Sequence, residues 1–231
     1  DGGTSLFWYD KLGRIVASQN EKQALTKKYS YSKYDALGRV FEAGELTAAA
    51  DLNQSTESQR QSWLNDANYP NTPWMISGSK KQITATKFDE PTLTSLAGFM
   101  QENLRKRVSA TSIDYDGNGI PEYNSYYSYD IHGNVKVLVN ENAALPVGGQ
   151  MTKFKKTEYE YDLVSGNVNA VHYQNAKPDQ FHHRYYYDAD NRITDVYTSR
   201  NAVIWEKEAK YYYYAHGPMA RTEIGDKQVA G

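Results

Sequence analysis

Residues 114–122 read Asp-Tyr-Asp-Gly-Asn-Gly-Ile-Pro-Glu, which places side-chain oxygens at alternate positions beside glycines that permit a sharp turn. This spacing is typical of the first half of a calcium-binding loop, because Ca²⁺ prefers carboxylate, amide and carbonyl oxygens. Ser125 stands where such a loop carries its bidentate Glu, so a plain hairpin tip is the alternative interpretation. Calcium is the one cofactor that the sequence suggests. The candidate metal ligands are Asp114, Asp116, Asn118 and Glu122.

Side chains that could support catalysis lack the spacing that known mechanisms need. The sequence has no G-x-S-x-G nucleophile turn, no H-E-x-x-H zinc motif and no phosphate-binding glycine loop. Because neighbouring strand residues point to opposite faces, His182 and His183 cannot chelate one ion together. His132, His172 and His216 are interpreted as ordinary surface or core residues. We therefore expect no catalytic residue and no enzymatic activity.

A Tyr-Asp-x-x-Gly-Arg stretch occurs at residues 9–14 and 34–39, and looser versions follow along the chain. Asp at the first position of a four-residue turn accepts hydrogen bonds from the backbone N–H groups after it. Gly at the fourth position, or Asn as the next-best residue, tolerates the positive φ that closes a bulged hairpin loop. Each stretch therefore predicts a hairpin tip, and the stretch at 214–217 keeps the Tyr and Gly but lacks the Asp. The predicted turn residues are Tyr9, Asp10, Gly13, Arg14, Tyr34, Asp35, Gly38, Arg39, Tyr129, Asp130, Gly133, Tyr161, Asp162, Gly166, Tyr187, Asp188, Asn191 and Arg192.

Arginine follows the turn at one fixed position, in Arg14, Arg39 and Arg192. A row of arginines could bind an anionic ligand. The favoured hypothesis is structural: each Arg pairs with a turn Asp or stacks over a neighbouring Tyr. The tyrosines admit two interpretations as well, since exposed rows of rings bind sugars whereas rings in a hairpin array form a core shared between hairpins.

The composition favours a folded chain with a tyrosine-rich core. The 231 residues include 21 Tyr against 6 Phe and 4 Trp, and a buried Tyr ring can keep its hydroxyl hydrogen-bonded. A net charge of −2 and a pI near 6.2 give no field that favours nucleic acid. The lack of cysteine excludes a disulfide scaffold. No apolar run approaches the ~20 residues of a membrane-spanning helix.

The strands around the turns alternate between tyrosine and charge. In residues 157–162, Thr157, Tyr159 and Tyr161 share one face, and the acidic residues between them share the other. The turn positions 130, 162, 188 and 214 step by 32, 26 and 26 residues, enough for two strands and their loops. One hairpin cannot bury its face alone. The pattern predicts an all-β chain of repeated antiparallel hairpins that pack side by side in one sheet.

Two stretches interrupt this repeat. Residues 45–75 contain Ser55 as a candidate N-cap, followed by Glu57, Gln61 and Leu64, which predicts a short helix ending near Asn65. Tyr69 to Trp74 is expected to be an extended loop bounded by prolines. Residues 90–105 form a second irregular segment. Because the first insertion is too small for a core of its own, we predict a single unit over residues 1–231.

Three stretches resemble the YD repeats of the Rhs family: Tyr-Asp-Ala-Leu-Gly-Arg-Val at 34–40, Tyr-Ser-Tyr-Asp-Ile-His-Gly-Asn-Val at 127–135 and Tyr-Tyr-Tyr-Asp-Ala-Asp-Asn-Arg-Ile-Thr at 185–194. That family includes bacterial Rhs proteins, shell components of Tc insecticidal toxins, wall-associated proteins and animal teneurins. The resemblance covers most of residues 1–44 and 105–231. It implies that this chain is a curved, spiralling sheet, as a partial shell or solenoid. In the family such sheets form a hollow shell, often around a C-terminal toxin domain, in a bacterial protein that is secreted or displayed at the cell surface.

The resemblance thus implies a non-catalytic structural segment of a larger chain that encapsulates or displays a C-terminal effector. Its partners would be the remaining repeats and the C-terminal domain of that parent chain, with neither nucleic acid nor a membrane span. The self-cleavage region that follows the repeats in that family has no candidate here. The alternative is a cell-surface carbohydrate-binding module that uses the Tyr-rich face for a glycan.

Overall fold

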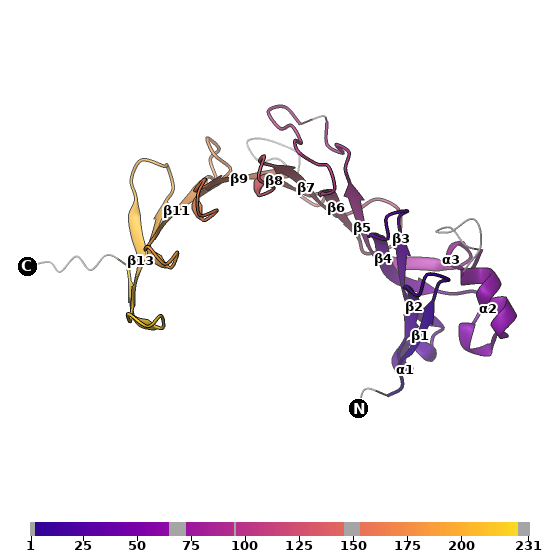
Figure 1. Ribbon diagram of the computed structural model, residues 1–231. Helices are drawn as coiled ribbons and strands as arrows, with labels where there is room; N and C mark the ends of the chain where they lie inside the picture. Colours follow the sequence, from indigo (N-terminus) through magenta and orange to yellow (C-terminus); the bar gives the residue numbers. More distant parts are fainter. Residues whose placement is uncertain (1–2, 65–72, 95, 146–152, 226–231) are drawn as a thin grey trace, which may run out of the picture. The chain divides into compact units, whose positions relative to one another are not determined.

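The computed structural model describes residues 3–64, 73–94, 96–145 and 153–225. Within these residues, fourteen strands are each antiparallel to the strand before and are hydrogen-bonded in sequence order as one open sheet (Figure 1). Helices are few and short, so the predicted all-β class is confirmed. The curvature and spiral implied by the family resemblance stay predictions. No helix in the described part of the chain is long and apolar enough to cross a membrane.

Backbone contacts divide the chain into two compact units. Unit 1 comprises residues 1–92 and 105–125, and unit 2 comprises residues 93–104 and 126–231. The expectation of a single unit over residues 1–231 stays a prediction, because compactness does not measure independent folding.

Unit 1 is built from hairpins whose loops begin at a motif Tyr or its equivalent. Its strands are β1 (Leu6–Tyr9), β2 (Ile15–Gln19), β3 (Lys28–Tyr34), β4 (Val40–Thr47), β5 (Ser79–Phe88) and β6 (Val108–Asp114). The register shifts by one residue at Tyr9, Tyr34 and Phe88, which marks a β-bulge at each loop. Between β2 and β3 lies α1 (Glu21–Ala24), which Asn20 caps through reciprocal hydrogen bonds with Gln23.

The predicted helical insertion joins β4 to β5 and contains η1 (Leu52–Gln54), α2 (Glu57–Leu64) and α3 (Pro73–Ile76). Thr56 is the residue that caps α2: its Oγ1 accepts a hydrogen bond from Gln59 N at 3.2 Å, and the Gln59 side chain accepts one from Thr56 N at 2.9 Å. The predicted cap was one residue early, because Ser55 Oγ donates to the Asp51 carbonyl at 2.6 Å. The predicted helix end at 65 and residues 69–72 of the predicted extended loop lie outside the described residues. The end of that prediction was wrong, because Pro73 and Trp74 belong to α3.

The insertion packs on β2, β3 and β4 and buries the core of unit 1. The rings of Tyr29 and Trp74 meet edge-on, with centroids 5.2 Å apart. The Tyr29 hydroxyl donates to Asp51 at 2.7 Å and accepts from Leu52 N at 3.0 Å, so the fully buried ring keeps its polar end paired. The buried residues of this core are Val16, Ala17, Tyr29, Tyr31, Leu46, Ala48, Leu52, Leu64, Trp74 and Met75.

Unit 2 repeats the hairpin plan with less helical cover. Its strands are β7 (Tyr123–Tyr129, which begins in unit 1), β8 (Val135–Asn142), β9 (Phe154–Tyr161), β10 (Val168–Tyr173), β11 (Phe181–Tyr187), β12 (Ile193–Ser199), β13 (Glu206–Tyr213) and β14 (Met219–Ile224). Residues 93–104, part of the predicted irregular segment, belong to this unit. There Leu93 and Phe99 pack with Val139, and Gln101 Nε2 donates to the Tyr127 carbonyl at 3.0 Å.

Candidate functional site

The carboxylate of each turn Asp holds the loop that follows it. Asp35 Oδ1 accepts hydrogen bonds from the backbone N of Leu37 and of Arg39, both at 2.9 Å, and Asp35 Oδ2 accepts from Arg39 Nε at 2.7 Å. Asp10 and Asp188 repeat this geometry. One side chain therefore satisfies backbone donors that no strand can reach.

The fourth turn position adopts the left-handed conformation in each of these loops. Gly38 has a φ of +80° and donates its N–H to the Asp35 carbonyl at 3.0 Å, which closes the loop. Asn191 takes the same place with a φ of +62°. The corresponding glycines of the other turns are Gly13, Gly133 and Gly166.

Two turns keep this plan without an arginine. Asn134 Nδ2 donates to Asp130 Oδ2 at 2.9 Å, in the place of an Arg Nε. In the longer loop at 162–167, Ser165 Oγ donates to Asp162 Oδ1 at 2.8 Å. The turn thus needs a donor opposite the carboxylate, and that donor need not be charged.

The turn carboxylates are held in their ionised form. Hydrogen bonds from the Arg192 side chain and backbone lower the pKa of Asp188 below its usual value. At Asp10, burial raises the pKa, but hydrogen bonds from the backbone and side chain of Arg14 outweigh it, and the net shift is downward.

Each turn Arg also stacks on an aromatic ring that belongs to the next hairpin. The guanidinium carbon lies over that ring within the distance of a cation–π contact, which is worth ~0.5–1 kcal/mol at exposed sites. Pairing with Asp and stacking on an aromatic ring therefore occur together at these arginines. The pairs and centroid distances are Arg14 with Tyr34 at 4.5 Å, Arg39 with Phe88 at 4.0 Å and Arg192 with Tyr213 at 4.6 Å.

The hydroxyl of the motif Tyr reaches back to the preceding hairpin. It donates a hydrogen bond to the carbonyl of the first residue in that hairpin's outgoing strand, and we call this contact the Tyr latch. The latch explains why Tyr occupies a position where Phe would bury similar area. In the part of the chain that the structure describes, latches join Tyr34 to Ile15 at 2.8 Å, Tyr161 to Val135 at 2.9 Å, Tyr187 to Val168 at 2.7 Å and Tyr213 to Ile193 at 2.8 Å.

One turn of the series, at Phe88 and Asp89, was not predicted from the sequence. Asp89 N donates to the Arg107 carbonyl at 3.1 Å, as Asp35 N does to Arg39, and Lys106 takes the positive-φ position at +61°. The intervening residues 90–105 are inserted inside the loop. The signal is present as Phe-Asp before the insertion and Lys-Arg-Val after it.

In the last turn, the motif Tyr lies one residue earlier than predicted. Tyr213 makes the latch and carries the Arg192 stack, so it is the motif Tyr. Tyr214 takes the place of the Asp, since its N–H donates to the Pro218 carbonyl and its own carbonyl accepts from Gly217, both at 3.0 Å.

The predicted calcium ligands lie in the loop between β6 and β7. Carboxylate oxygens of Asp114, Asp116 and Glu122 approach within 4.8 Å of one another, a donor set that fits a hard cation. The loop is also self-satisfied: Asp114 accepts from the N–H of Gly117 at 2.7 Å, and Glu122 from that of Tyr115 at 2.9 Å. Asn118 Oδ1 accepts from Ile120 N at 2.7 Å. Both interpretations of this loop therefore keep structural support.

A buried charged cluster in unit 1 is structural in its geometry. Glu42 Oε1 accepts from the Tyr31 hydroxyl at 2.8 Å and lies 2.9 Å from Lys80 Nζ and 3.2 Å from Lys33 Nζ. Burial lowers the pKa of Lys33 and raises that of Tyr31. The Glu42 carboxylate thus offsets part of the charge of the two lysines, since partly buried charges need a partner.

The tyrosines of unit 2 stack along their own strands. Tyr159 and Tyr161 have centroids 6.4 Å apart, and His183 lies parallel to Tyr185 at 6.1 Å. These rings are half-buried. They form neither a closed core nor a fully open row of rings.

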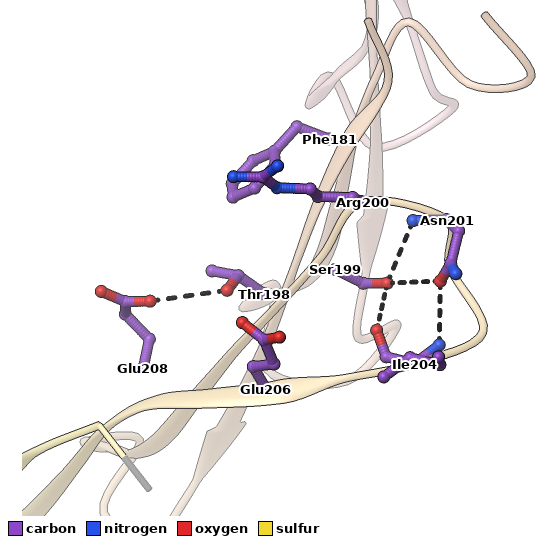
Figure 2. Close-up of a pocket in the computed structure, with 8 residues that line it drawn as sticks. All are labelled: Phe181, Thr198, Ser199, Arg200, Asn201, Ile204, Glu206 and Glu208. Carbon is purple, nitrogen blue, oxygen red and sulfur yellow. Dashed lines mark hydrogen bonds between the residues drawn. The ribbon is translucent and has the colours of Figure 1, made fainter. Parts of the chain in front are cut away.

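A surface pocket in unit 2 lies where β12 turns into β13 (Figure 2). Asn201 organises the turn, because its Oδ1 accepts from Ile204 N at 2.9 Å and from the Ser199 hydroxyl at 3.2 Å. Glu208 accepts from Thr198 Oγ1 at 3.4 Å. The residues described as lining this pocket include no histidine or lysine that could activate Ser199 as a nucleophile.

The fold and the turns define a class of antiparallel hairpin-repeat sheets. Among solved structures, the fold is similar to the crystal structure of TcdB2-TccC3 without the hypervariable C-terminal region, with a TM-score of 0.58 and 14% identity over 97% of this chain and 9% of that chain. The Tc holotoxin pore of Photorhabdus luminescens also matches, with 15% identity over 98% of this chain and 11% of that chain, but its TM-score of 0.30 carries no argument. The chain spans about a tenth of the length of these solved chains.

Neither a protein-family model nor a curated protein sequence matches the chain. At this identity, the likeness to TcdB2-TccC3 shows a shared fold alone.

Proposed function

We propose that this chain is a non-catalytic, structural YD-repeat segment of an Rhs-type shell or cell-surface protein. The observation that carries the proposal is the Tyr latch, which joins successive hairpins by the same hydrogen bond at Tyr34, Tyr161, Tyr187 and Tyr213. A contact repeated from hairpin to hairpin extends one continuous sheet and does not bring residues together at a single binding or catalytic site. The fold shared with TcdB2-TccC3 supports the same role.

In the full form of this proposal, the parent chain is a secreted or surface-displayed bacterial protein that encloses or displays a C-terminal effector. Its partners within the parent chain are this effector and the repeats that continue the sheet. The turn Asp and Arg side chains are already engaged by their own loop or by the next hairpin, so few of their polar groups are free to act in catalysis. This supports a structural role.

Protease protection in the parent polypeptide tests the proposal. A domain downstream of the repeats should resist protease in the intact protein and become sensitive when Tyr161, Tyr187 and Tyr213 are all changed to Phe. The matched control is Tyr186→Phe, because the Tyr186 hydroxyl has no protein partner in the described residues. Equal digestion of the downstream domain in all versions would count against enclosure.

Carbohydrate binding through the Tyr face is the second candidate, and one pocket of unit 2 favours it. Tyr185 and Tyr187 line this pocket together with Asn167, Asn169 and Asn191, which supply amide groups beside aromatic rings. Aromatic faces with hydrogen-bonding amides are the usual chemistry of a sugar site. A glycan array should then show binding that Tyr185→Ala abolishes without unfolding, and that Tyr214→Ala retains.

A further inference from the structure

Two histidines of unit 2 face each other across neighbouring strands. His172 on β10 is the direct cross-strand partner of His182 on β11. Their Nδ1 atoms are 2.8 Å apart, and their ring centroids are 5.1 Å apart. His183 lies on the opposite face, where it stacks on Tyr185 and takes no part in this contact.

The other nitrogen of each ring faces an acceptor. His172 Nε2 lies 3.2 Å from Glu160 Oε1, and an ionised carboxylate can only accept a hydrogen bond. His182 Nε2 lies 3.3 Å from Gln180 Oε1, and the same oxygen accepts from Ala176 N at 3.0 Å, which fixes the orientation of the amide. Both Nε2 atoms therefore carry protons in this arrangement.

This proton assignment leaves a lone pair on each Nδ1, and the two lone pairs point at each other at hydrogen-bond distance. Such a contact is repulsive unless a cation lies between the nitrogens. One proton shared between the two nitrogens removes the repulsion. A metal ion can do the same, because the Nδ1 lone pair of neutral imidazole can bind either a proton or a metal ion.

We propose that His172 and His182 bind one divalent transition-metal ion of the Zn²⁺, Ni²⁺ or Cu²⁺ class through their Nδ1 atoms. Metal-binding histidines commonly donate their second N–H to a carboxylate or carbonyl oxygen, and Glu160 and Gln180 occupy those positions here. In a tetrahedral site two nitrogen ligands stand about 3.3 Å apart, so small ring rotations admit the ion.

The surroundings favour a cation at this place. Glu158 lies directly opposite His172 on β9, and Lys156 Nζ at 3.0 Å from its carboxylate offsets part of that charge. The side chain of His172 is 17% exposed and gives access to solvent, whereas His182 is fully buried. Solvent water would supply the remaining ligands of the bound ion.

Charged groups on the adjoining strands also face this pair. Arg184, which lies over the Trp205 ring at 4.1 Å, adds positive charge on a neighbouring position of β11. Glu160 on β9 and Glu208 on β13, which acts on His183, are the acidic groups nearest these rings from the adjoining strands.

Calorimetric titration of the tag-free chain with Ni²⁺ or Zn²⁺ near pH 7.5 tests the proposal. We expect one ion per chain. His172→Gln should abolish binding, and Glu160→Gln should weaken it about tenfold. His172→Gln is the decisive variant because this ring is partly exposed, while His182→Gln changes a buried position.

The matched controls are His183→Gln and His216→Gln, which should bind as the unchanged chain does, with circular dichroism used to check the fold of every variant. Binding that survives His172→Gln would overturn the proposal. So would the absence of binding by the unchanged chain at millimolar metal, because the pair would then hold a proton only.

Discussion

The hydroxyl of Tyr187 donates a hydrogen bond of 2.7 Å to the main-chain carbonyl of Val168, one hairpin earlier in the chain. Val168 begins the outgoing strand β10, and Tyr187 ends the incoming strand β11. The bond therefore lies beside the β-bulge at the loop, where the register shifts and a regular ladder hydrogen bond is missing. The Tyr187 hydroxyl thus supplies a hydrogen-bond donor to the Val168 carbonyl.

Removing the latch at Tyr187 should destabilise the chain modestly. Tyr187→Phe keeps the ring and leaves the Val168 carbonyl without its donor, so we expect a loss of about 1 kcal/mol in the free energy of unfolding. Urea denaturation measures this change. Tyr186→Phe is the control, since this ring is 48% exposed and its hydroxyl has no protein partner in the described residues. Equal stability of both variants would show that the latch contributes nothing.

The turn aspartates should make stability depend on pH in the acid range. Hydrogen bonds from the side chain and backbone of Arg192 lower the pKa of Asp188 in the folded chain. A lowered pKa contributes stability above the unfolded value of about 3.9, and this contribution is lost as the pH falls through the folded value. The urea midpoint should thus be steady from about pH 7 to 5 and fall below about pH 4.

Asp188→Asn isolates one of these carboxylates. The variant should be less stable than the unchanged chain at pH 7, and the difference should shrink as the pH falls, because protonated Asp188 also loses its charge. Denaturation curves at several pH values give this difference directly. A difference that is constant with pH would mean that the carboxylate charge plays no part.

The repeat could be predicted wherever the motif is contiguous in sequence. Asp35, Gly38 and Arg39 lie within five residues, and local turn chemistry fixes their geometry. The turn at Phe88 and Asp89 was missed because residues 90–105 separate it from Lys106 and Arg107, and no local rule joins positions so far apart. What brings them together is the pairing of β5 with β6.

The histidine pair lay beyond sequence reasoning for a different reason. Alternation along a strand shows which face His172 and His182 occupy, but cross-strand partners depend on the register of β10 with β11. The connecting loop sets that register through Gln174 and Ala176, whose φ values are +49° and +60°. Neither residue is a usual choice for positive φ, so the sequence carries no signal for the loop geometry.

The free energy of unfolding should depend strongly on which residue occupies the positive-φ position of a turn. Gly38 has a φ of +80°, and the nearest atom to an added Cβ is Arg14 Nη1 at 3.9 Å, so Gly38→Ala meets backbone strain without a clash. We expect a cost of about 1 kcal/mol in the free energy of unfolding. Asn191→Gly, which places glycine where φ is already +62°, should be neutral within ~0.5 kcal/mol in the same urea experiment. An Ala variant as stable as the unchanged chain would contradict the strain argument.

The loop at 114–122 should bind calcium weakly, because three carboxylates converge there while the position of the bidentate Glu is held by Ser125. We expect a dissociation constant on the order of 10⁻⁴–10⁻³ M, the range of sites with few charged ligands and relaxed geometry. Calorimetric titration with CaCl₂ measures it. Asp116→Asn should abolish binding, because the exposed Asp116 makes hydrogen bonds only to Asn118 and its change leaves the Asp114 contacts to Gly117 and Gly119 in place. Asp190→Asn, at an exposed turn position in unit 2, is the control. If millimolar calcium produces no heat, the convergence of Asp114, Asp116 and Glu122 serves only to close the hairpin through its backbone N–H groups.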